Sequence, residues 1–270
     1  MVSVADVEYA YRLILGREPE SQDTVRRLTE NCATLEDLRA RFLASKEFQD
    51  RVAARPATAD RMATIEDHSQ NGEFRELLRL MVAESAPTKV IVDVGAHGRD
   101  GSNSYDLLKQ FGWRGLLIEA NPSLAQRIET AFKGLDYNLV ACAVSDSEGV
   151  GNLSLGVNLG VSSLSSEKTR VWGPVSGSIE VPVRRLHNIL DEHNIPKTFD
   201  ILSLDIEGYE ARVLNDLHKS SAYRPTWIVM EGSHDFTIAD PVKIGVERAV
   251  TEDYEVVSRN PVNLFLRRRA

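Results

Sequence analysis

The sequence predicts an α/β protein with a doubly wound, mostly parallel sheet, an antiparallel last strand and a small N-terminal helical domain. Three observations carry this prediction. A β-branched apolar strand at 90–94 leads into a glycine-rich turn, a helix and a second apolar strand. Further short apolar strands alternate with amphipathic helices, as in βαβ units. The chain ends in two strands joined by a short turn, and such a pair is antiparallel.

Three regions follow from the pattern along the chain. Residues 1–55 have apolar side chains at helical spacing and predict a small helical domain, in which Thr34 and Asp37 resemble a capping box. Residues 56–88 contain a linker and an amphipathic helix, expected over 71–86. Residues 89–270 hold the sheet. We expect its strands at 90–94, 115–118, 138–144, 179–186, 199–205, 226–230, 254–258 and 263–267.

Two parts of the sheet region depart from regular alternation. Residues 147–178 are rich in glycine and serine, which predicts a hairpin plus a mobile loop over the site. Trp172 in that loop is expected either to stack on a sugar or to anchor the loop. The strand 179–186 is expected on the edge or surface, and Pro182 fits an edge better than a centre because proline cannot donate to a central ladder.

Composition limits the setting of the protein. Apolar content of 42% and charged content of 27% are ordinary for a soluble globular chain of 270 residues. No apolar run approaches the roughly 18 residues of a membrane helix, and no secretion signal is evident. Cys32 and Cys142 lack metal-ligand spacing, so we expect reduced thiols and a cytoplasmic location. The net charge of −8 argues against nucleic acid as the main partner.

The glycine-rich turn and the acid after the second strand indicate a nucleotide-type cofactor. Glu119 stands where a carboxylate accepts from both ribose hydroxyls. His97 occupies the position at which a dinucleotide fingerprint requires its second glycine. Asp93, inside the first strand, suits a cofactor with a positively charged amino-acid end. These features favour S-adenosylmethionine over NAD; the alternative is a tight βα turn without a ligand.

The third strand end completes the expected cofactor site. Ala143 and Val144 are expected to line an adenine ring, and Ser145 or Asp146 to accept from its amine. A plain polar turn is the alternative for Asp146. We therefore expect cofactor contacts from Asp93, Gly95, His97, Gly98, Gly101, Asn103, Glu119, Ala120, Ala143, Val144 and Asp146.

The remaining strand ends carry the groups expected at the reacting centre. A hydroxyl is a weak nucleophile that needs a base, a metal or both. His234 is the expected base, with a surface loop histidine as the alternative. Asp205 and Glu231 are expected to hold Mg²⁺ if the site uses it, and Asp205 alternatively holds the cofactor's ammonium. Glu207 is expected to act in catalysis, or otherwise to complement the dipole of a helix that it opens.

Six motifs occur in an order that resembles one known family. They are VDVGAH, SNSYDLLKQFGWRGLLIEANP, AVSDSEG, SSL, DILSLDIEGYEARVL and IVMEGSH, within residues 90–266. Together they resemble the FkbM family of S-adenosylmethionine-dependent O-methyltransferases. The resemblance implies a class I methyltransferase fold, methylation of a hydroxyl that is often on a sugar, and carboxylates at Asp205 and Glu207 facing the acceptor. Where relatives tend to have G-A-N, this chain has G-A-H at 95–97.

The N-terminal region carries a second resemblance. YRLILGREPE and FLASKEF resemble a small helical domain of unknown function that recurs beside glycosyltransferases, which implies a glycan setting. We expect the acceptor to be a carbohydrate, as a surface glycan, a glycolipid or a nucleotide-sugar precursor. The N-terminal helices are expected to mediate self-association or contact with glycan-assembly enzymes. The alternatives are a nicotinamide-dependent sugar-nucleotide oxidoreductase or epimerase and a non-catalytic scaffolding protein.

Overall fold

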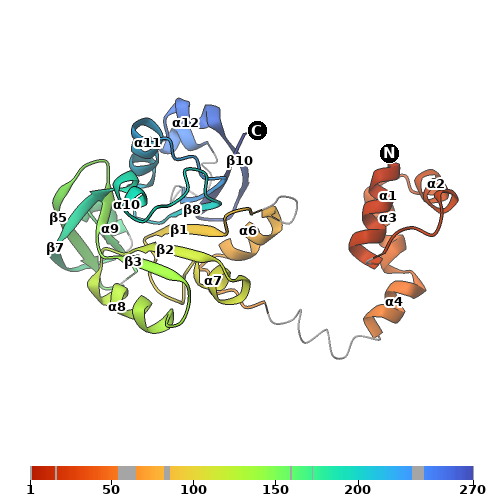
Figure 1. Cartoon of the computed structure of the whole chain (residues 1–270), viewed down its shortest axis with the longest axis horizontal. Helices are drawn as coiled ribbons and strands as arrows, with labels where there is room; N and C mark the ends of the chain where they lie inside the picture. The colour runs from red at the N-terminus through yellow and green to blue at the C-terminus, as the bar shows by residue number, and fades with distance from the viewer. Residues whose placement is uncertain are drawn as a thin grey trace. The chain divides into compact units, whose positions relative to one another are not determined.

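The structure, a computed structural model, forms two compact units, residues 1–65 and 66–270 (Figure 1). It describes residues 2–15, 17–53, 65–81, 86–158, 160–171, 173–232 and 240–269.

The first unit is helical, as predicted. Its core brings together Val7, Tyr11, Val25 and Phe42. The predicted capping box is confirmed, because the Asp37 amide donates to Thr34 Oγ1 (3.1 Å) and the Thr34 amide donates to Asp37 Oδ2 (2.9 Å). The helices are α1 (Val4–Ala10), the π-helix η1 (Tyr11–Leu15), α2 (Gln22–Asn31), α3 (Leu35–Leu43) and α4 (Lys46–Ala53).

The second unit contains a seven-stranded sheet in the order β10-β11-β9-β8-β1-β2-β3. Neighbouring strands are parallel except for β11, which is antiparallel to both β9 and β10. This order and the reversed strand confirm the predicted class I methyltransferase-like fold. The strands are β1 (Val90–Val94), β2 (Arg114–Ile118), β3 (Tyr137–Val140), β8 (Ile201–Leu204), β9 (Trp227–Glu231), β10 (Tyr254–Arg259) and β11 (Asn263–Arg268).

Helices cover both faces of this sheet, so β1 is buried along its whole length. Val90, Val92 and Val94 belong to a core cluster shared with α10 and α11, whereas Ile91 belongs to a cluster shared with α6, α7 and α8. The alternation follows from the two-residue repeat of a strand. The helices are α6 (Glu73–Met81), α7 (Tyr105–Phe111), α8 (Pro122–Ala131), α10 (Leu186–Glu192), α11 (Glu210–Ser220), the 3₁₀ helix η2 (Pro241–Ile244) and α12 (Arg248–Asp253).

A second sheet of four strands, in the order β4-β7-β5-β6, corrects two predictions. The expected single strand at 138–144 is two strands, β3 in the main sheet and β4 (Ala143–Ser145) in the second. The expected edge strand is β7 (Val175–Arg185), which lies between β4 and β5 (Gly149–Gly156). The short β4 explains how Pro182 is accommodated, because β4 pairs only with Val183, Arg184 and Arg185.

The segment 147–178 is more ordered than the sequence suggested. Within this segment β5 pairs antiparallel with the short β6, but its long antiparallel partner is β7, which includes the strand expected separately at 179–186. The rest is not a structureless loop, since it contains β6 (Ser162–Ser163) and α9 (Ser166–Val171). Thr169 of α9 is fully buried, which ties this helix to the sheet. Trp172 lies outside the described residues.

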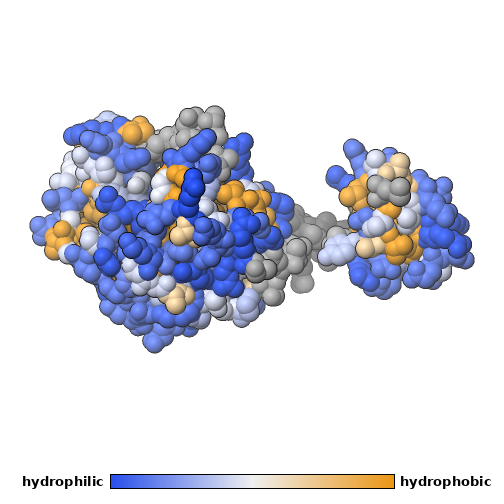
Figure 2. Space-filling view, turned by 90° about the horizontal axis from the view of Figure 1, so that it is seen from above, coloured by the Kyte–Doolittle hydropathy of each residue, from blue (hydrophilic) through white to orange (hydrophobic). Residues whose placement is uncertain are grey.

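The surface of the second unit is mostly hydrophilic in the view of Figure 2, with small separate apolar areas. Both cysteines, Cys32 and Cys142, are free and buried, in line with the expected thiols. Among the described helices, none has the length and apolar character needed to cross a membrane.

Candidate active site

A cavity of about 690 Å³ lies in the second unit, beyond the carboxyl ends of β1, β2, β8 and β9. Ligands of open α/β sheets bind at this edge. Of the predicted site residues, the cavity lining includes Gly95, His97, Gly101, Asn103, Glu119, Ala120, Ala143, Val144, Asp205, Glu207 and Glu231.

The turn after β1 begins with a glycine that the packing requires. Gly95 has φ +83°, and a Cβ atom built on it would lie 1.8 Å from the carbonyl oxygen of Asp205. No side chain fits at such a distance, so the turn passes directly against the end of β8. The Gly95 amide donates to the Ile118 carbonyl (2.9 Å), which also ties the turn to β2. The ends of three strands are thereby held close together.

His97 connects this turn to two other parts of the cavity wall. Its backbone is left-handed (φ +57°), and its amide donates to Glu119 Oε2 (3.0 Å). Its Nδ1 lies 2.8 Å from the Asp100 carbonyl oxygen. Cβ atoms built on Gly101 and Gly160 would lie 3.2 and 2.7 Å from its ring nitrogens. The imidazole therefore fills the space between the glycine turn and the loop that joins β5 to β6.

Glu119 is buried at the end of β2, with an exposed fraction of 6%. Oε1 accepts from the Asn121 amide (2.8 Å) and Oε2 accepts from His97, so the carboxylate is held in one orientation. Burial raises its pKa, and these two amides oppose the shift. A carboxylate oxygen has more than one acceptor site, so both oxygens can still accept a ribose hydroxyl.

Asn103 and Asp93 lie below the glycine turn. Asn103 Nδ2 donates to Ser203 Oγ (3.1 Å), while the buried Asn103 Oδ1 has no hydrogen-bond partner among the described residues. Asp93 is 2% exposed and lies behind the lining; its pKa is raised by burial, and the Ser104 and Ser203 hydroxyls oppose that shift. Because Asn103 lines the cavity, its free acceptor suits an ammonium donor.

The other end of the cavity is apolar. Ala143 and Val144 of β4 line it together with Leu124 and Leu153. Asp146 is not part of the described lining; it accepts from Ser145 Oγ (3.0 Å) and lies 3.8 Å from the Arg212 guanidinium. Gly98 also lies behind the lining, where its amide donates to the Ala96 carbonyl (2.6 Å).

An acidic cluster of Asp205, Glu210 and Glu231 occupies the centre of the sheet edge. Carboxylate oxygens of all three lie within 4.8 Å of one another. Burial and the charge of Asp205 raise the pKa of Glu231 to about 9. Burial and the charge of Glu207 raise the pKa of Asp205 well above its ordinary value. Burial and mutual repulsion therefore favour the protonated forms of these carboxyl groups, and a bound cation would favour the ionised forms.

The turn between β8 and α11 gives Glu207 and Glu210 different roles. The helix begins at Glu210, so Glu207 does not open it as expected. Glu210 accepts from the amides of Ile206 (2.8 Å) and Gly208 (3.0 Å), and it holds the turn. Glu207 lines the cavity with a left-handed backbone (φ +55°), and its carbonyl accepts from Ser163 Oγ (2.9 Å). A strained backbone conformation of this kind is frequent at functional sites.

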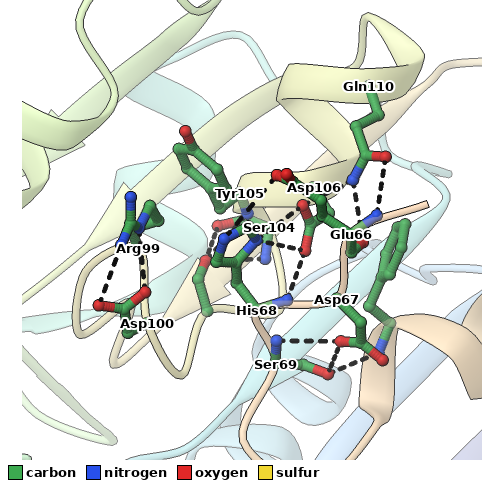
Figure 3. Close-up of polar contacts among 12 residues, drawn as sticks. Glu66, Asp67, His68, Ser69, Arg99, Asp100, Ser104, Tyr105, Asp106 and Gln110 are labelled. Atoms are coloured by element: carbon green, nitrogen blue, oxygen red, sulfur yellow. Dashed lines mark hydrogen bonds and ion pairs between the residues drawn. The ribbon is translucent and has the colours of Figure 1, made fainter. Parts of the chain in front are cut away.

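Residues 66–71, which we call the strap, run along the glycine turn and α7 (Figure 3). The His68 amide donates to Asp106 Oδ2 (2.7 Å), and His68 Nδ1 lies 3.1 Å from Asp106 Oδ1. The Gly101 amide donates to the His68 carbonyl (2.6 Å). Gln110 extends the contact by donating to Asp106 and to the Glu66 carbonyl. These bonds hold Gln70 and Asn71 at the cavity.

Sequence reasoning missed part of this lining. Gln70, Asn71 and Glu73 fall at the start of what we interpreted as a covering helix, and Asn263 falls at a strand start. The burial of Glu73 is visible only in the structure, and no pattern in the sequence marks these residues as cavity lining. His234, the predicted base, lies outside the described residues.

Comparison with known proteins identifies the family of this chain. The Methyltransferase FkbM domain matches residues 93–244, which is more than half of the chain. No curated protein matches significantly.

Solved structures give distant likenesses. One is an O-methyltransferase from Bacillus cereus in complex with SAH, with 13% identity, a TM-score of 0.39 and coverage of 97% of this chain and 96% of that chain. Another is a TehB-like SAM-dependent methyltransferase from Corynebacterium glutamicum, with 14% identity, a TM-score of 0.38 and coverage of 83% and 100%. The domain match is decisive: the chain belongs to the FkbM methyltransferase family.

Proposed function

We propose that this protein transfers a methyl group from S-adenosylmethionine to a hydroxyl of a carbohydrate. The observation that carries the proposal is a single cavity that contains both the buried Glu119 and the acidic side chains Asp205, Glu207 and Glu231. The first is suited to a ribose, and the others lie where a reacting hydroxyl would need hydrogen-bond acceptors. The family match supports methyl transfer.

The lining supports S-adenosylmethionine as the cofactor. Glu119 would accept from the ribose hydroxyls, and Ala143 and Val144 would pack against the adenine. At the other end, the unpartnered Asn103 Oδ1 would accept from the amino group. The bound cofactor would supply a methyl group already activated by its sulfonium. Since His97 fills the place of the second glycine, the turn offers no room of the kind that a pyrophosphate needs.

The work left to the protein is to orient the hydroxyl and take its proton. In the transfer, the acceptor oxygen forms a bond to the methyl carbon, the sulfur–carbon bond breaks, and the hydroxyl proton moves to a base. Asp205 and Glu207 face the cavity and can align the hydroxyl. We propose His234 as the base; replacing it with Ala is expected to lower turnover while the affinity for S-adenosylhomocysteine is unchanged.

Mg²⁺ would fit the acidic cluster. Carboxylate oxygens are the ligands that it prefers, and Asp205 and Glu231 could each contribute one. Glu210 is less suited because two amides already donate to it. A cation here would compensate the buried charge and keep both carboxylates ionised.

The nature of the product tests the proposal. Full-length protein is incubated with ¹³C-methyl-labelled S-adenosylmethionine and neutral glycosides, with and without Mg²⁺, and the products are examined by ¹³C NMR. A methyl ether signal is expected, and Asp205→Asn is expected to reduce it at least about tenfold. Label appearing as an N-methyl or C-methyl group, or no transfer by protein that binds the cofactor, would contradict the proposal.

The carbohydrate acceptor is the finer part of the proposal. It is supported by the resemblance of residues 1–55 to a domain that recurs beside glycosyltransferases, and by the hydrogen-bonding side chains that line the cavity. Uncharged amides and carboxylates are suited to hydroxyl groups, because together they offer donors and acceptors at short range.

A further inference from the structure

One wall of the cavity comes from outside the segment that matches the family. The glycine turn, Glu119 and the acidic cluster all lie within residues 93–244. Two other segments contribute lining residues, one before this range and one after it. We call them the flanking wall, which consists of Gln70, Asn71, Glu73, Pro261, Val262 and Asn263.

Glu73 holds the flanking wall together. Its side chain is 1% exposed, and its carboxylate accepts from the Asn71 amide (2.8 Å). It also accepts from Asn260 Nδ2 and Asn263 Nδ2, both at 2.7 Å. The first residue of α6 is thereby joined to the turn between β10 and β11, which lies about 190 residues further along the chain. A buried carboxylate with three donors fixes the side chains around it.

The flanking wall is continuous with the acidic cluster. Asn263 begins β11 and is the register partner of Glu231, the last residue of β9. The Val262 carbonyl accepts from the Gly232 amide (2.7 Å), directly after that glutamate. Any group held by the flanking wall is therefore next to Glu231 of the acidic cluster.

The described lining of the cavity is rich in acidic side chains and contains no Lys or Arg. The amides of the lining are Gln70, Asn71, Asn103, Asn158 and Asn263. The carboxylates are Glu73, Asp100, Glu119, Asp205, Glu207 and Glu231.

Two cations, Arg99 and Lys168, lie near the cavity but outside its described lining. Arg99 Nε is paired with Asp100 Oδ1 at 2.9 Å. Lys168 of α9 packs its aliphatic chain against Gly208, where an added Cβ would lie 2.9 Å from Cε. Its charge favours the ionised forms of Glu210 and Glu231. A phosphate, with a charge of about −1.5 to −2, would meet acidic side chains here, and no described lining residue is a Lys or Arg that could pair with it.

We propose that the flanking wall is the acceptor subsite and that it takes a neutral, hydroxyl-bearing sugar without phosphate. This inference rests on the proposed function and narrows it, because it excludes a nucleotide-sugar diphosphate from the group seated in the cavity. Amide and carboxylate side chains bind hydroxyls through both donors and acceptors, whereas phosphate sites use arginine, lysine or clustered backbone N–H groups. Glu73 is a positioning residue that acts through Asn71 and Asn263.

A matched pair of ligands tests the subsite. Full-length protein is saturated with S-adenosylhomocysteine, and the binding of glucose and glucose 6-phosphate is measured by saturation-transfer NMR. Glucose is expected to bind at least about tenfold more tightly, a difference of about 1.4 kcal/mol. Binding of glucose 6-phosphate as tight as that of glucose, or tighter, would overturn the acceptor-subsite proposal but leave the proposed function standing. The absence of a glucose signal with protein that holds S-adenosylhomocysteine would have the same consequence. Failure to bind S-adenosylhomocysteine would overturn the proposed function and this inference with it.

Glu73→Gln tests the positioning role. It keeps the side-chain volume but weakens the bonds to both asparagines, so glucose affinity is expected to fall about tenfold with S-adenosylhomocysteine affinity unchanged. Glu76→Gln is the control, since Glu76 lies on the same helix, contacts Arg79 and Ser258 and is not part of the described lining. Unchanged glucose binding in Glu73→Gln would contradict the role. If that variant does not fold, the comparison of glucose with glucose 6-phosphate on the native protein still tests the subsite.

Discussion

The glycine turn and the flanking wall line the same cavity but are built in different ways. The turn, residues 95–101, depends on backbone contacts so close that side chains are excluded, as at Gly95. The flanking wall depends on side-chain hydrogen bonds to one buried carboxylate, Glu73. Backbone contact leaves little freedom for substitution, whereas side chains at the flanking wall can change without rebuilding the sheet. This difference suits a fixed cofactor on one side and a variable acceptor on the other.

The largest expected effect comes from a substitution that disrupts the glycine turn itself. Gly95→Ala would place a methyl group 1.8 Å from the Asp205 carbonyl oxygen and force an L-residue to φ +83°. We expect a loss of at least about 3 kcal/mol in the free energy of unfolding, measured by urea denaturation. Gly177→Ala is the control, because an added Cβ there meets nothing within 4 Å. Equal stability of the two variants would contradict the close approach of β1 and β8.

The next effect concerns cofactor affinity. Glu119→Ala removes an acceptor proposed to bind two ribose hydroxyls and frees the His97 amide. Hydrogen bonds to a charged group contribute about 1.5–3 kcal/mol each, so S-adenosylhomocysteine is expected to bind at least about 100-fold more weakly in calorimetry. Glu129→Ala, at an exposed position on α8, should bind as the native protein does. Normal binding by Glu119→Ala would remove the ribose assignment.

A third effect is a pH dependence of stability that comes from the acidic cluster. In the unfolded chain Glu231 ionises near its ordinary pKa of 4.5, while in the folded protein its pKa is about 9. Between these values the folded state binds a proton that the unfolded state has lost. The stabilisation from that proton is therefore present at low pH and is lost as the pH rises toward 9.

In Glu231→Gln this position no longer titrates. The free energy of unfolding should therefore fall less steeply with rising pH, by up to about 1.4 kcal/mol per pH unit. The measurement is urea denaturation between about pH 5 and pH 8 with a chelator present. Burial also raises the pKa values of Asp205 and Glu210, so part of the pH dependence of stability will remain in the variant. Parallel curves for the variant and the native protein would mean that Glu231 is already ionised in the folded state.

The smallest expected effect tests the structural role of the His97 ring. Gly160→Ala would place a Cβ 2.7 Å from the His97 ring, so the loop must shift at a cost of about 1–2 kcal/mol. We expect S-adenosylhomocysteine affinity to fall about tenfold. In the double variant with His97→Ala, the added methyl should cost less, because the ring that it meets is gone. Strictly additive losses would show that the loop does not rest on this histidine.

The sequence predicted the main sheet well because its signals are local. Apolar strands, glycine turns and polar strand ends each lie within a few residues, and β1, β2 and Glu119 were found from them. The strand within 179–186 was also predicted, but its pairing with β5 was not. The split of 138–144 between two sheets was missed, because two short strands in one apolar run look like a single strand.

The missed parts of the site depend on long-range contacts. The bonds from Asn260 and Asn263 to Glu73 join positions nearly 190 residues apart. No periodicity or motif connects those positions in the sequence. The placement of Asp146 beside Arg212 rather than on the cavity is of the same kind, since it depends on how α11 packs near β4.

Calorimetric titration with S-adenosylhomocysteine, run against NAD on the same protein, tests the central claim most directly. The claim is that the cavity behind Gly95, His97 and Glu119 holds S-adenosylmethionine. Saturable heat with S-adenosylhomocysteine and none with NAD is the predicted result. Saturable binding of NAD with no response to S-adenosylhomocysteine would contradict the claim and would show that the glycine turn accommodates a pyrophosphate after all.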